Sequence, residues 1–309
     1  MPNSSLQNGG QRTGTEPNGT RARSKQEAAT RSTQPGLYLV ATPIGNARDI
    51  TLRALDVLET ADYIACEDTR VSGKLMTIYG LKKSLIAYHE HNADKVRPRL
   101  LNDVENGKTV ALISDAGTPL ISDPGFKLVR DCRAKGLPVY PLPGASSVMA
   151  ALVVAGLPTD RFLFAGFPPA KQGARRKFLE SLKETDATLV LFESPKRLAA
   201  SLKDAAEILG SREATVCREL TKLYEETRNG TLDVLADQLA AEAPPKGEIV
   251  LVIGPPTEKP PLEQGSIDDL LVKALDGHKV KEAAALVAET TGLPKRDLYQ
   301  RALILKERS

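Results

Sequence analysis

Four short loops in the sequence have unusual compositions, and three of them combine proline, glycine and small hydroxyl residues in a way that suits the binding of a small organic molecule. They read TPIGN from Thr42, CEDTR from Cys66, SDAGTPLISDPG from Ser114 and PLPGASS from Pro141. Glycine and other small residues let a ligand approach the main chain, and the N–H groups that such bends leave unpaired can hold it. One Gly–Pro loop alone is more often a structural turn. The three loops that contain both residue types together indicate one cofactor pocket, read largely by backbone groups.

The common nucleotide-binding motifs are missing. No Gly-x-Gly-x-x-Gly follows the first predicted strand, and no Gly-x-x-x-x-Gly-Lys-Ser/Thr occurs in the chain. Glycines at those spacings hold the phosphates of dinucleotides and of nucleoside triphosphates. The sequence therefore favours a cofactor that has no pyrophosphate.

The segment YHEHNAD, from Tyr88, places His89, Glu90 and His91 side by side. Zinc helices carry their two histidines four residues apart, which is not the spacing here. A solvated strand end or a loop on the substrate side explains the segment better than a metal site, and we expect no metal.

The elements that must position these loops alternate between short apolar runs and amphipathic segments of about a dozen residues. This alternation is typical of a parallel sheet covered by helices on both faces, whose ligands bind beyond the carboxyl ends of the strands. In the first half of the chain the predicted strands are 37–41, 62–68, 108–115 and 137–144, and the predicted helices are 49–61 and 124–136.

A second alternating set follows a Pro- and Gly-rich crossing that begins near Leu157. Its predicted strands are 187–194, 213–220 and 247–254, and its predicted helices are 194–210 and 230–242. We therefore expect an α/β fold of two α/β domains with mainly parallel sheets, at residues 35–153 and 154–256.

The two ends of the chain differ from these domains. Residues 1–34 are polar and almost without large apolar side chains, which predicts a disordered, solvated tail rather than a targeting signal. A proline-rich linker follows the second domain. Residues 265–309 read as a helical appendage with helix-turn-helix spacing.

Composition narrows the class of protein further. The 309 residues suffice for about two domains, and the 41% hydrophobic and 26% charged residues are those of a globular protein. No stretch approaches the roughly 18 to 20 apolar residues of a membrane helix, so we expect a cytoplasmic protein with no membrane contact. Cys66, Cys132 and Cys217 lie far apart and predict reduced thiols. The net charge of +3 is only mildly basic, so any RNA contact must come from local patches.

Eight segments together resemble one family. In order they are LYLVATPIGN, CEDTR, SDAGTPLISDPG, PLPGASS, GLPTDRFLFAGFPP, FESPKR, RELTKLYEE and KGEIVLVI. They are similar to the 16S ribosomal RNA cytidine 2'-O-methyltransferases of the tetrapyrrole methylase superfamily. The resemblance covers roughly residues 37–254 and continues into the helical end of the chain.

The resemblance implies an enzyme that uses S-adenosyl-L-methionine to methylate the ribose 2'-hydroxyl of a cytidine in the decoding region of 16S rRNA. It also implies a homodimer, a cleft between the two α/β domains and, as partner, 16S rRNA within the small ribosomal subunit. The cofactor-binding residues that it implies are Pro43, Gly45, Asp115, Ala116, Gly117, Thr118, Ile121, Pro143, Gly144, Ser146, Ser147, Phe192, Glu193, Gly247 and Glu248. Where tetrapyrrole methylases usually carry Gly-Asp-Pro, this chain has Gly117-Thr118-Pro119, which leaves open the side chain that anchors the methionine part of the donor.

A ribose hydroxyl is a poor nucleophile at neutral pH, so a positioned proton acceptor should help by about 10² to 10⁴ in rate. The sequence does not single one out. The catalytic candidates are Glu67, Asp68, Arg70 and His89, with Glu193 or Lys196 as further polar residues. The alternative for CEDTR is an ion-paired helix cap, in which Asp68 caps and Arg70 pairs with Glu67.

Contacts to RNA phosphates need local positive charge. The segment KQGARRK supplies Lys171, Arg175, Arg176 and Lys177, and the helical end supplies Lys295, Arg296 and Arg301. A smaller cluster holds Arg97 and Arg99. A charged loop is often only solvated, and the helical end could simply be a packing appendage on a dimer.

Two other functions remain open from the sequence. A methylase acting on a tetrapyrrole would use the same donor, but it would not need the basic loop or the helical end. A non-catalytic nucleic-acid-binding protein built around the helix-turn-helix segment would bind no donor at all.

Overall fold

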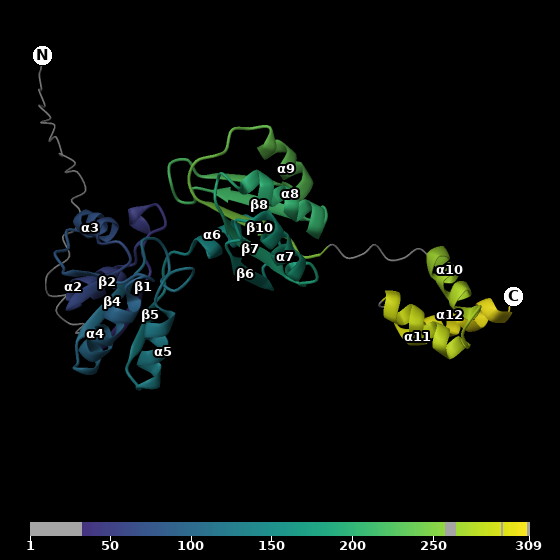
Figure 1. Ribbon diagram of the computed structural model, residues 1–309, viewed down its shortest axis with the longest axis horizontal. Helices are drawn as coiled ribbons and strands as arrows, with labels where there is room; N and C mark the ends of the chain where they lie inside the picture. Colours follow the sequence, from purple (N-terminus) through teal and green to yellow (C-terminus); the bar gives the residue numbers. More distant parts are fainter. Residues whose placement is uncertain (1–32, 257–263, 292, 308–309) are drawn as a thin grey trace, which may run out of the picture. The chain divides into compact units, whose positions relative to one another are not determined.

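The computed structural model of the protein describes residues 33–256, 264–291 and 293–307 (Figure 1). By its contacts the chain divides into two units, residues 1–150 with Glu219–Glu225, and the remainder. The predicted tail at residues 1–34 lies outside the described residues, apart from its last two.

The first unit is built on a five-stranded sheet in which every pairing is parallel. The strand order is β3-β2-β4-β1-β5. The core strands β1, β2 and β4 are the continuous apolar runs of the sequence, as expected for strands covered on both faces. The five strands are β1 (Gly36–Val40), β2 (Tyr63–Cys66), β3 (Leu85–Ala87), β4 (Thr109–Ile113) and β5 (Val139–Leu142).

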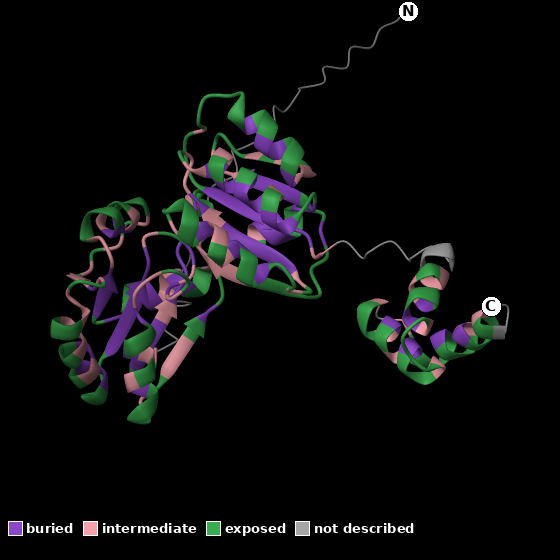
Figure 2. Cartoon of the chain, turned by 45° about the vertical axis from the view of Figure 1, so that its right-hand side comes forward, coloured by how far each residue is buried: buried purple, intermediate pink, exposed green. Residues whose placement is uncertain are grey.

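Helices cover both faces of this sheet, so that its strands form the buried middle layer in Figure 2. Alternate residues along β1 enter different clusters: Tyr38 and Val40 pack with residues of α2 and α3, whereas Leu37 packs with residues of α4 and α5. The helical elements of this half are η1 (Ala47–Asp49), α2 (Leu52–Thr60), α3 (Thr69–Ile78), α4 (Ala93–Glu105), α5 (Phe126–Ala134) and α6 (Ser147–Val154).

The second unit holds another five-stranded sheet, and it corrects one sequence expectation. Its order is β6-β7-β10-β8-β9, but only β6 and β7 are parallel, while the other three pairings are antiparallel. The prediction of mainly parallel sheets is therefore confirmed for the first sheet and wrong for the second. The strands are β6 (Phe162–Gly166), β7 (Thr188–Glu193), β8 (Glu213–Arg218), β9 (Glu226–Thr231) and β10 (Ile249–Ile253).

The hairpin that β8 and β9 form accounts for one of the three antiparallel pairings, and β10, which runs antiparallel to both β7 and β8, makes the other two. Two strands joined by a short loop pair antiparallel, because only a long crossover allows parallel pairing. The sequence predicted no strand at β9, and it began the following helix at residue 230 rather than at Leu232.

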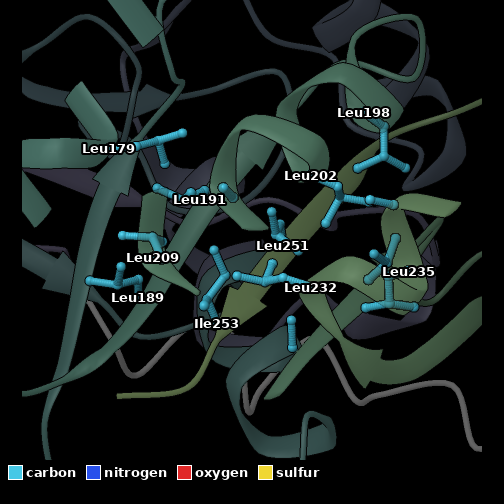
Figure 3. Close-up of a cluster of buried hydrophobic side chains, with 14 of the residues drawn as sticks. Leu179, Leu189, Leu191, Leu198, Leu202, Leu209, Leu232, Leu235, Leu251 and Ile253 are labelled. Carbon is cyan, nitrogen blue, oxygen red and sulfur yellow. The ribbon is translucent and has the colours of Figure 1, made fainter. Parts of the chain in front are cut away.

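The core of the second unit lies between one face of its sheet and three helices, α7 (Gln172–Leu182), α8 (Leu198–Leu209) and α9 (Leu232–Ala240). Figure 3 shows leucines from all three helices gathered against alternate residues of the strands, among them Leu189, Leu191, Leu251 and Ile253. The helices meet the sheet through the apolar stripe that the 3.6-residue period predicts.

The helical end of the chain has its own small core. It consists of α10 (Gln264–Leu275), α11 (Val280–Thr291) and α12 (Lys295–Glu307), packed around Leu271, Ala284, Val287, Leu298 and Ala302. The Arg301 guanidinium is engaged within the helical end, because it donates two hydrogen bonds of 2.7 and 2.6 Å to the Asp268 carboxylate. Within the described residues, no helix is long and apolar enough to cross a bilayer.

Candidate functional site

Three of the four loops singled out from the sequence meet beyond the carboxyl ends of the first sheet. The N–H of Thr42 donates to the carbonyl of Gly117 at 2.9 Å, and the N–H of Gly117 donates back at 3.0 Å. The Thr42 hydroxyl donates to the Ser114 carbonyl at 3.1 Å, and the Thr118 hydroxyl donates to the Ala145 carbonyl at 3.0 Å. The loops after β1, β4 and β5 are thus fastened to one another.

Two glycines allow this close approach. Gly117 has φ +82°, and a Cβ built on it would lie 3.3 Å from Ile44 Cγ2. A Cβ on Gly144 would lie only 2.7 Å from the Cβ of Ala41. A larger residue at either position would push the loops apart.

The bend around Gly117 leaves main-chain donors open. Within the described residues, the N–H groups of Ala116 and Thr118 have no hydrogen-bond partner, and Ala116 is exposed. The loop after β5 leads directly into the first turn of α6 at Ser147, where helix N–H groups also lack intrahelical partners. Such groups suit the carboxylate and hydroxyl oxygens of an organic cofactor.

Backbone strain marks the same region. Leu120 and Ser122, in the loop after β4, have φ of 74° and 64°. In the described part of the chain, the other non-glycine residues with positive φ are Glu219 and Thr221, which also belong to the first unit. Each such residue costs roughly 1–3 kcal/mol, and such residues concentrate at functional sites.

A group of acidic side chains lies beside these loops. The N–H of Asp68 donates to Asp115 Oδ1 at 3.1 Å, which brings the loop after β2 against the loop after β4. Burial, and then repulsion by Glu67, raises the pKa of Asp123 to about 6. Burial, and next the charge of Asp115, raises the pKa of Glu67 above its usual value, and burial likewise raises the pKa of Asp115. Burial is the main cause of all three shifts, and repulsion between the carboxyls adds to it.

His89 lies close enough to Glu67 for its charge to oppose that rise in pKa. Its Nδ1 is buried and has no hydrogen-bond partner among the described residues. Its backbone N–H donates to Asn92 Oδ1 at 2.9 Å, which fixes the start of the turn before α4. His89 and Glu67 are therefore brought together, as a shared site requires.

Asp68 and Arg70 have a different role from Glu67. The Asp68 carboxylate caps α3 by accepting the N–H of Arg70 at 2.8 Å, and it pairs with the Arg70 guanidinium at 2.6 Å. Hydrogen bonds from Arg70 lower the pKa of Asp68 to about 2. This matches the helix-cap alternative, except that Arg70 pairs with Asp68 and not with Glu67.

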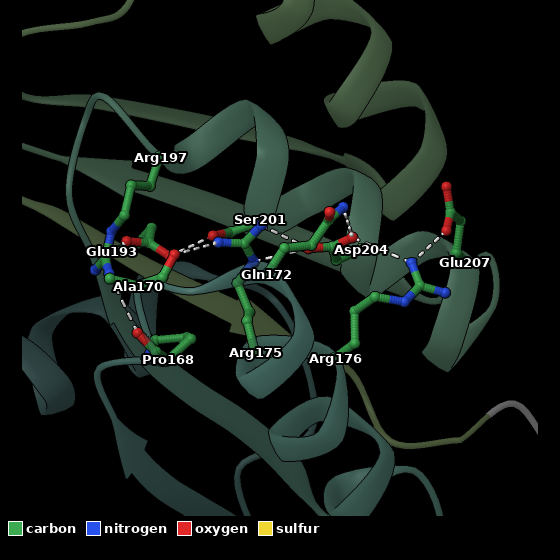
Figure 4. A network of polar contacts seen from close by, with 10 residues as sticks. All are labelled: Pro168, Ala170, Gln172, Arg175, Arg176, Glu193, Arg197, Ser201, Asp204 and Glu207. Carbon is green, nitrogen blue, oxygen red and sulfur yellow. Dashed lines mark hydrogen bonds and ion pairs between the residues drawn. The ribbon is translucent and has the colours of Figure 1, made fainter.

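The candidate donor-binding residues of the second unit differ in whether their side chains are open to a ligand. Glu193 is buried, and its carboxylate already accepts the N–H of Ser194. It also accepts the Ser201 hydroxyl and the Arg197 guanidinium (Figure 4). Its side chain is therefore not open to a ligand. Phe192 packs against Phe164 and Phe167 with ring centroids 4.8 and 5.2 Å apart. Gly247 and Glu248 are exposed.

The basic segment KQGARRK requires a correction. Arg175 is only 4% exposed and pairs with the buried Asp204 at 2.6 Å, so its prediction as an RNA contact is wrong. Arg176 pairs with both Asp204 and Glu207, as Figure 4 shows. Lys171 and Lys177 are exposed, as are Lys295 and Arg296 in the helical end.

Sequence reasoning missed Thr42, Ser114 and Asp123 as parts of the site. The first two fasten the loops, and the last belongs to the acidic group. All three lie inside loops that the sequence had singled out, so their position was the available signal. Within the described residues, no group of three or more His, Cys, Asp or Glu side chains is arranged to hold a metal ion.

Comparison with known proteins shows the class of protein to which the chain belongs. The family model described as Tetrapyrrole (Corrin/Porphyrin) Methylases matches residues 36–236, and the model described as RsmI C-terminal HTH domain matches residues 262–306. A uroporphyrin-III-C-methyltransferase from Thermus thermophilus has a TM-score of 0.52 at 23% identity, covering 71% of this chain and 94% of its own. A diphthine synthase has a TM-score of 0.55 at 16% identity, covering 71% and 89%. At these identities the likeness shows the fold alone.

Relatives in sequence narrow the class. A protein of Mesorhizobium japonicum named "Ribosomal RNA small subunit methyltransferase I" is 52% identical over 92% of this chain and 96% of its own length. A protein of Halalkalibacterium halodurans with the same name is 44% identical over 90% and 98%. The chain belongs to the ribosomal RNA small subunit methyltransferase I family, within the tetrapyrrole methylases. The family resemblance and the α/β fold expected from the sequence are thereby confirmed.

Proposed function

We propose that the chain transfers a methyl group from S-adenosyl-L-methionine to the ribose 2'-hydroxyl of a cytidine in the decoding region of 16S rRNA. The observation that carries the proposal is the 52% identity, over 92% of the chain, to a protein named as a small-subunit rRNA methyltransferase. The loops beyond the first sheet support it, because they present open main-chain donors rather than a phosphate-binding motif.

In the first unit, the residues that we assign to the donor lie in the three loops that are fastened together around Gly117. The free N–H groups of Ala116 and Thr118 would bind its polar groups, and the small residues after β5 would leave room for it. The donor supplies a methyl group activated by its sulfonium. The other residues assigned to it in the first unit are Pro43, Gly45, Asp115, Ile121, Pro143, Gly144, Ser146 and Ser147.

In the second unit we assign Phe192, Glu193, Gly247 and Glu248 to the donor, with one restriction. Because the Glu193 carboxylate is occupied by three donors, this residue would act through its main chain. Phe192 offers its partly exposed ring, which suits a flat heterocycle.

We assign the role of proton acceptor for the ribose hydroxyl to Glu67. Its pKa is raised by burial and by Asp115, which brings its basicity closer to that needed at neutral pH. His89 would support it from the same side. Asp68 and Arg70, which cap α3, would act only by positioning the loop that carries Glu67.

RNA binding would use the exposed cations that are not engaged in the described structure. In the basic segment these are Lys171 and Lys177, and in the helical end they are Lys295 and Arg296. We propose that the protein acts in the cytoplasm as a homodimer on rRNA within the small ribosomal subunit.

The test compares 16S rRNA from cells with and without the gene by mass spectrometry of nuclease fragments. One ribose methyl group on a decoding-region cytidine should be missing from the deletion strain. Purified protein and S-adenosyl-L-methionine should restore it on small subunits isolated from that strain. An unchanged fragment pattern in the deletion strain would refute the proposed substrate.

A further inference from the structure

The loop that joins β8 to β9, Glu219–Glu225, presents two adjacent apolar side chains to solvent. Leu223 is 88% exposed and Tyr224 is 67% exposed. One exposed leucine is ordinary on a protein surface. A neighbouring leucine and tyrosine at the tip of one loop form a small apolar patch, and such patches mark interaction sites. None of the loop residues is assigned to the donor or to proton transfer.

This loop is held in one shape. The N–H of Lys222 donates to the Glu219 carbonyl at 3.0 Å, and the N–H of Glu225 donates to the Lys222 carbonyl at 3.1 Å. The Glu225 carboxylate accepts the N–H of Thr221 at 2.7 Å. Glu219 and Thr221 both have positive φ, so the surrounding contacts hold a strained backbone. The hydrogen bonds of the loop therefore hold the backbone at Leu223 and Tyr224 in a defined conformation.

The loop also contacts the loop after β1. The N–H of Asn46 donates to Thr221 Oγ1 at 3.2 Å. A Cβ on Gly45 would lie 2.3 Å from Lys222 Cγ, so the two segments touch with no room to spare. Gly45 belongs to the proposed donor site, and Lys222 packs against it. Leu223 and Tyr224 come directly after Lys222 in the chain.

An exposed cation follows closely in sequence on the contact at Asn46. Arg48 follows Asn46 by two residues in η1 and is exposed. Its guanidinium has no hydrogen bond or ion pair within the described part of the chain. An exposed aromatic side chain and an unpaired cation, carried by two segments that touch at Asn46 and Thr221, suit single-stranded RNA, whose bases stack on aromatic rings and whose phosphates attract arginine.

We propose that Tyr224 and Leu223 form a stacking platform for a base of the RNA substrate next to the methylated nucleotide, with Arg48 contacting its phosphate. The proposal rests on the proposed function and names how that site selects its substrate. A base is the occupant that fits, because two side chains cover far less than the roughly 800 Å² that each partner buries in a stable protein interface.

The experiment measures methyl transfer to small ribosomal subunits from the deletion strain, with Tyr224→Ala, Leu223→Ala, Tyr224→Phe and Arg48→Ala. Base stacking of this kind predicts that Tyr224→Ala raises KM for the subunits about 5- to 150-fold and leaves kcat within about twofold. Tyr224→Phe keeps the ring and should behave as the wild type. Calorimetry with S-adenosyl-L-methionine should give the same Kd for all variants, because none of the substituted residues is assigned to the donor.

The matched control is Ile78→Ala, which removes a 63% exposed apolar side chain at the end of α3. It should leave KM unchanged. A KM for Tyr224→Ala equal to that of this control overturns the proposal. So does a change of oligomeric state in sedimentation velocity, which would assign the patch to a second copy of the chain. If the wild type itself transfers no methyl group to these subunits, the proposed function fails first and is recognised as such.

Discussion

Carboxylates and arginines lie in both units of the molecule, but their surroundings are opposite. In the second unit, Asp204 is buried beside Arg175, Arg176 and Gln172. Its burial would raise the pKa, but the hydrogen bonds of these partners outweigh the burial and lower it. In the first unit, burial raises the pKa values of Glu67, Asp115 and Asp123, and repulsion between neighbouring carboxyls adds to the rise.

The difference separates structural charge from functional charge. A buried carboxylate with all its partners in place orders two helices and is closed to ligands. Carboxyls that burial has perturbed without giving them cations are typical of sites that bind or transfer protons. The same residue types are therefore informative only once their partners are known.

The largest expected effect concerns the uncompensated group. Glu67→Gln keeps the shape of the side chain and removes its ability to take a proton, so the rate of methyl transfer should fall by about 10² to 10⁴. Single-turnover assays with saturating donor measure the rate. The Kd for S-adenosyl-L-methionine should not change; a variant that retains more than a tenth of the wild-type rate would remove Glu67 from the mechanism.

The second effect tests the compensated network. Arg175→Met leaves the Asp204 carboxylate buried without its main partner, which should lower the free energy of unfolding by about 3–5 kcal/mol. Urea denaturation followed by circular dichroism measures the loss. The double variant Arg175→Met/Asp204→Leu removes both charges and should recover most of it. If the double variant is no more stable than the single one, the cost lies in packing and not in the stranded charge.

A third effect separates backbone strain from the donor site. Gly117→Ala and Gly136→Ala both place a Cβ on a backbone with positive φ, at +82° and +68°, and each should cost about 1–2 kcal/mol of stability. Only the Cβ at Gly117 has a neighbour within 4 Å. We therefore expect about a tenfold weaker Kd for the donor, by calorimetry, in Gly117→Ala alone. Equal losses of affinity in both variants would contradict the assignment of this bend.

The fourth effect is a dependence of stability on pH. The pKa of Asp123 is raised to about 6, so the folded protein holds this proton more tightly than the unfolded chain does. The resulting stabilisation is complete below the unfolded pKa of about 4 and is lost as the pH rises through 6. Asp123→Asn should remove that slope and, after allowance for solvent screening, should be about 1 kcal/mol more stable than the wild type at pH 7.5. Urea titrations at pH 5 and 7.5 compare the two proteins, and equal slopes would disprove the burial of Asp123.

The smallest effect tests whether burial, and not the number of ion pairs, decides how much charged residues contribute to stability. Arg161 pairs with Asp186 at 2.8 Å, but both side chains are more than two-thirds exposed. Arg161→Ala should change the free energy of unfolding by less than about 0.5 kcal/mol in the same urea assay. A loss near that of Arg175→Met would abolish the distinction.

The sequence was most informative where local pattern alone decides structure. The apolar runs of β1, β2 and β4 could be read as buried parallel strands because each is covered on both faces. The strand β9 could not, since its residues Glu226–Thr231 are all polar or glycine and pair with β8 at the edge of the sheet. Its strand conformation depends on pairing with β8, which no local pattern records.

The site shows the same limit. The loops were predictable from their glycines and prolines, but the high pKa of Asp123 depends on its burial in the folded chain and then on Glu67, which is distant in sequence. For Arg175 a local signal did exist. Arg175, Leu179 and Leu182 recur at helical spacing on the buried face of α7, so a strict count of the period would have placed this arginine inside.

The first unit includes seven residues, Glu219–Glu225, that are synthesised after all the other residues of that unit. During synthesis the five parallel strands can pair once Leu142 has left the ribosome. At that stage Thr221 and Lys222, which contact Asn46 and Gly45, have not yet been made. The nascent chain must extend through β8 before these contacts can form. A chain that ended before Glu219 would thus contain every strand of the first sheet but would lack the segment that contacts the loop after β1.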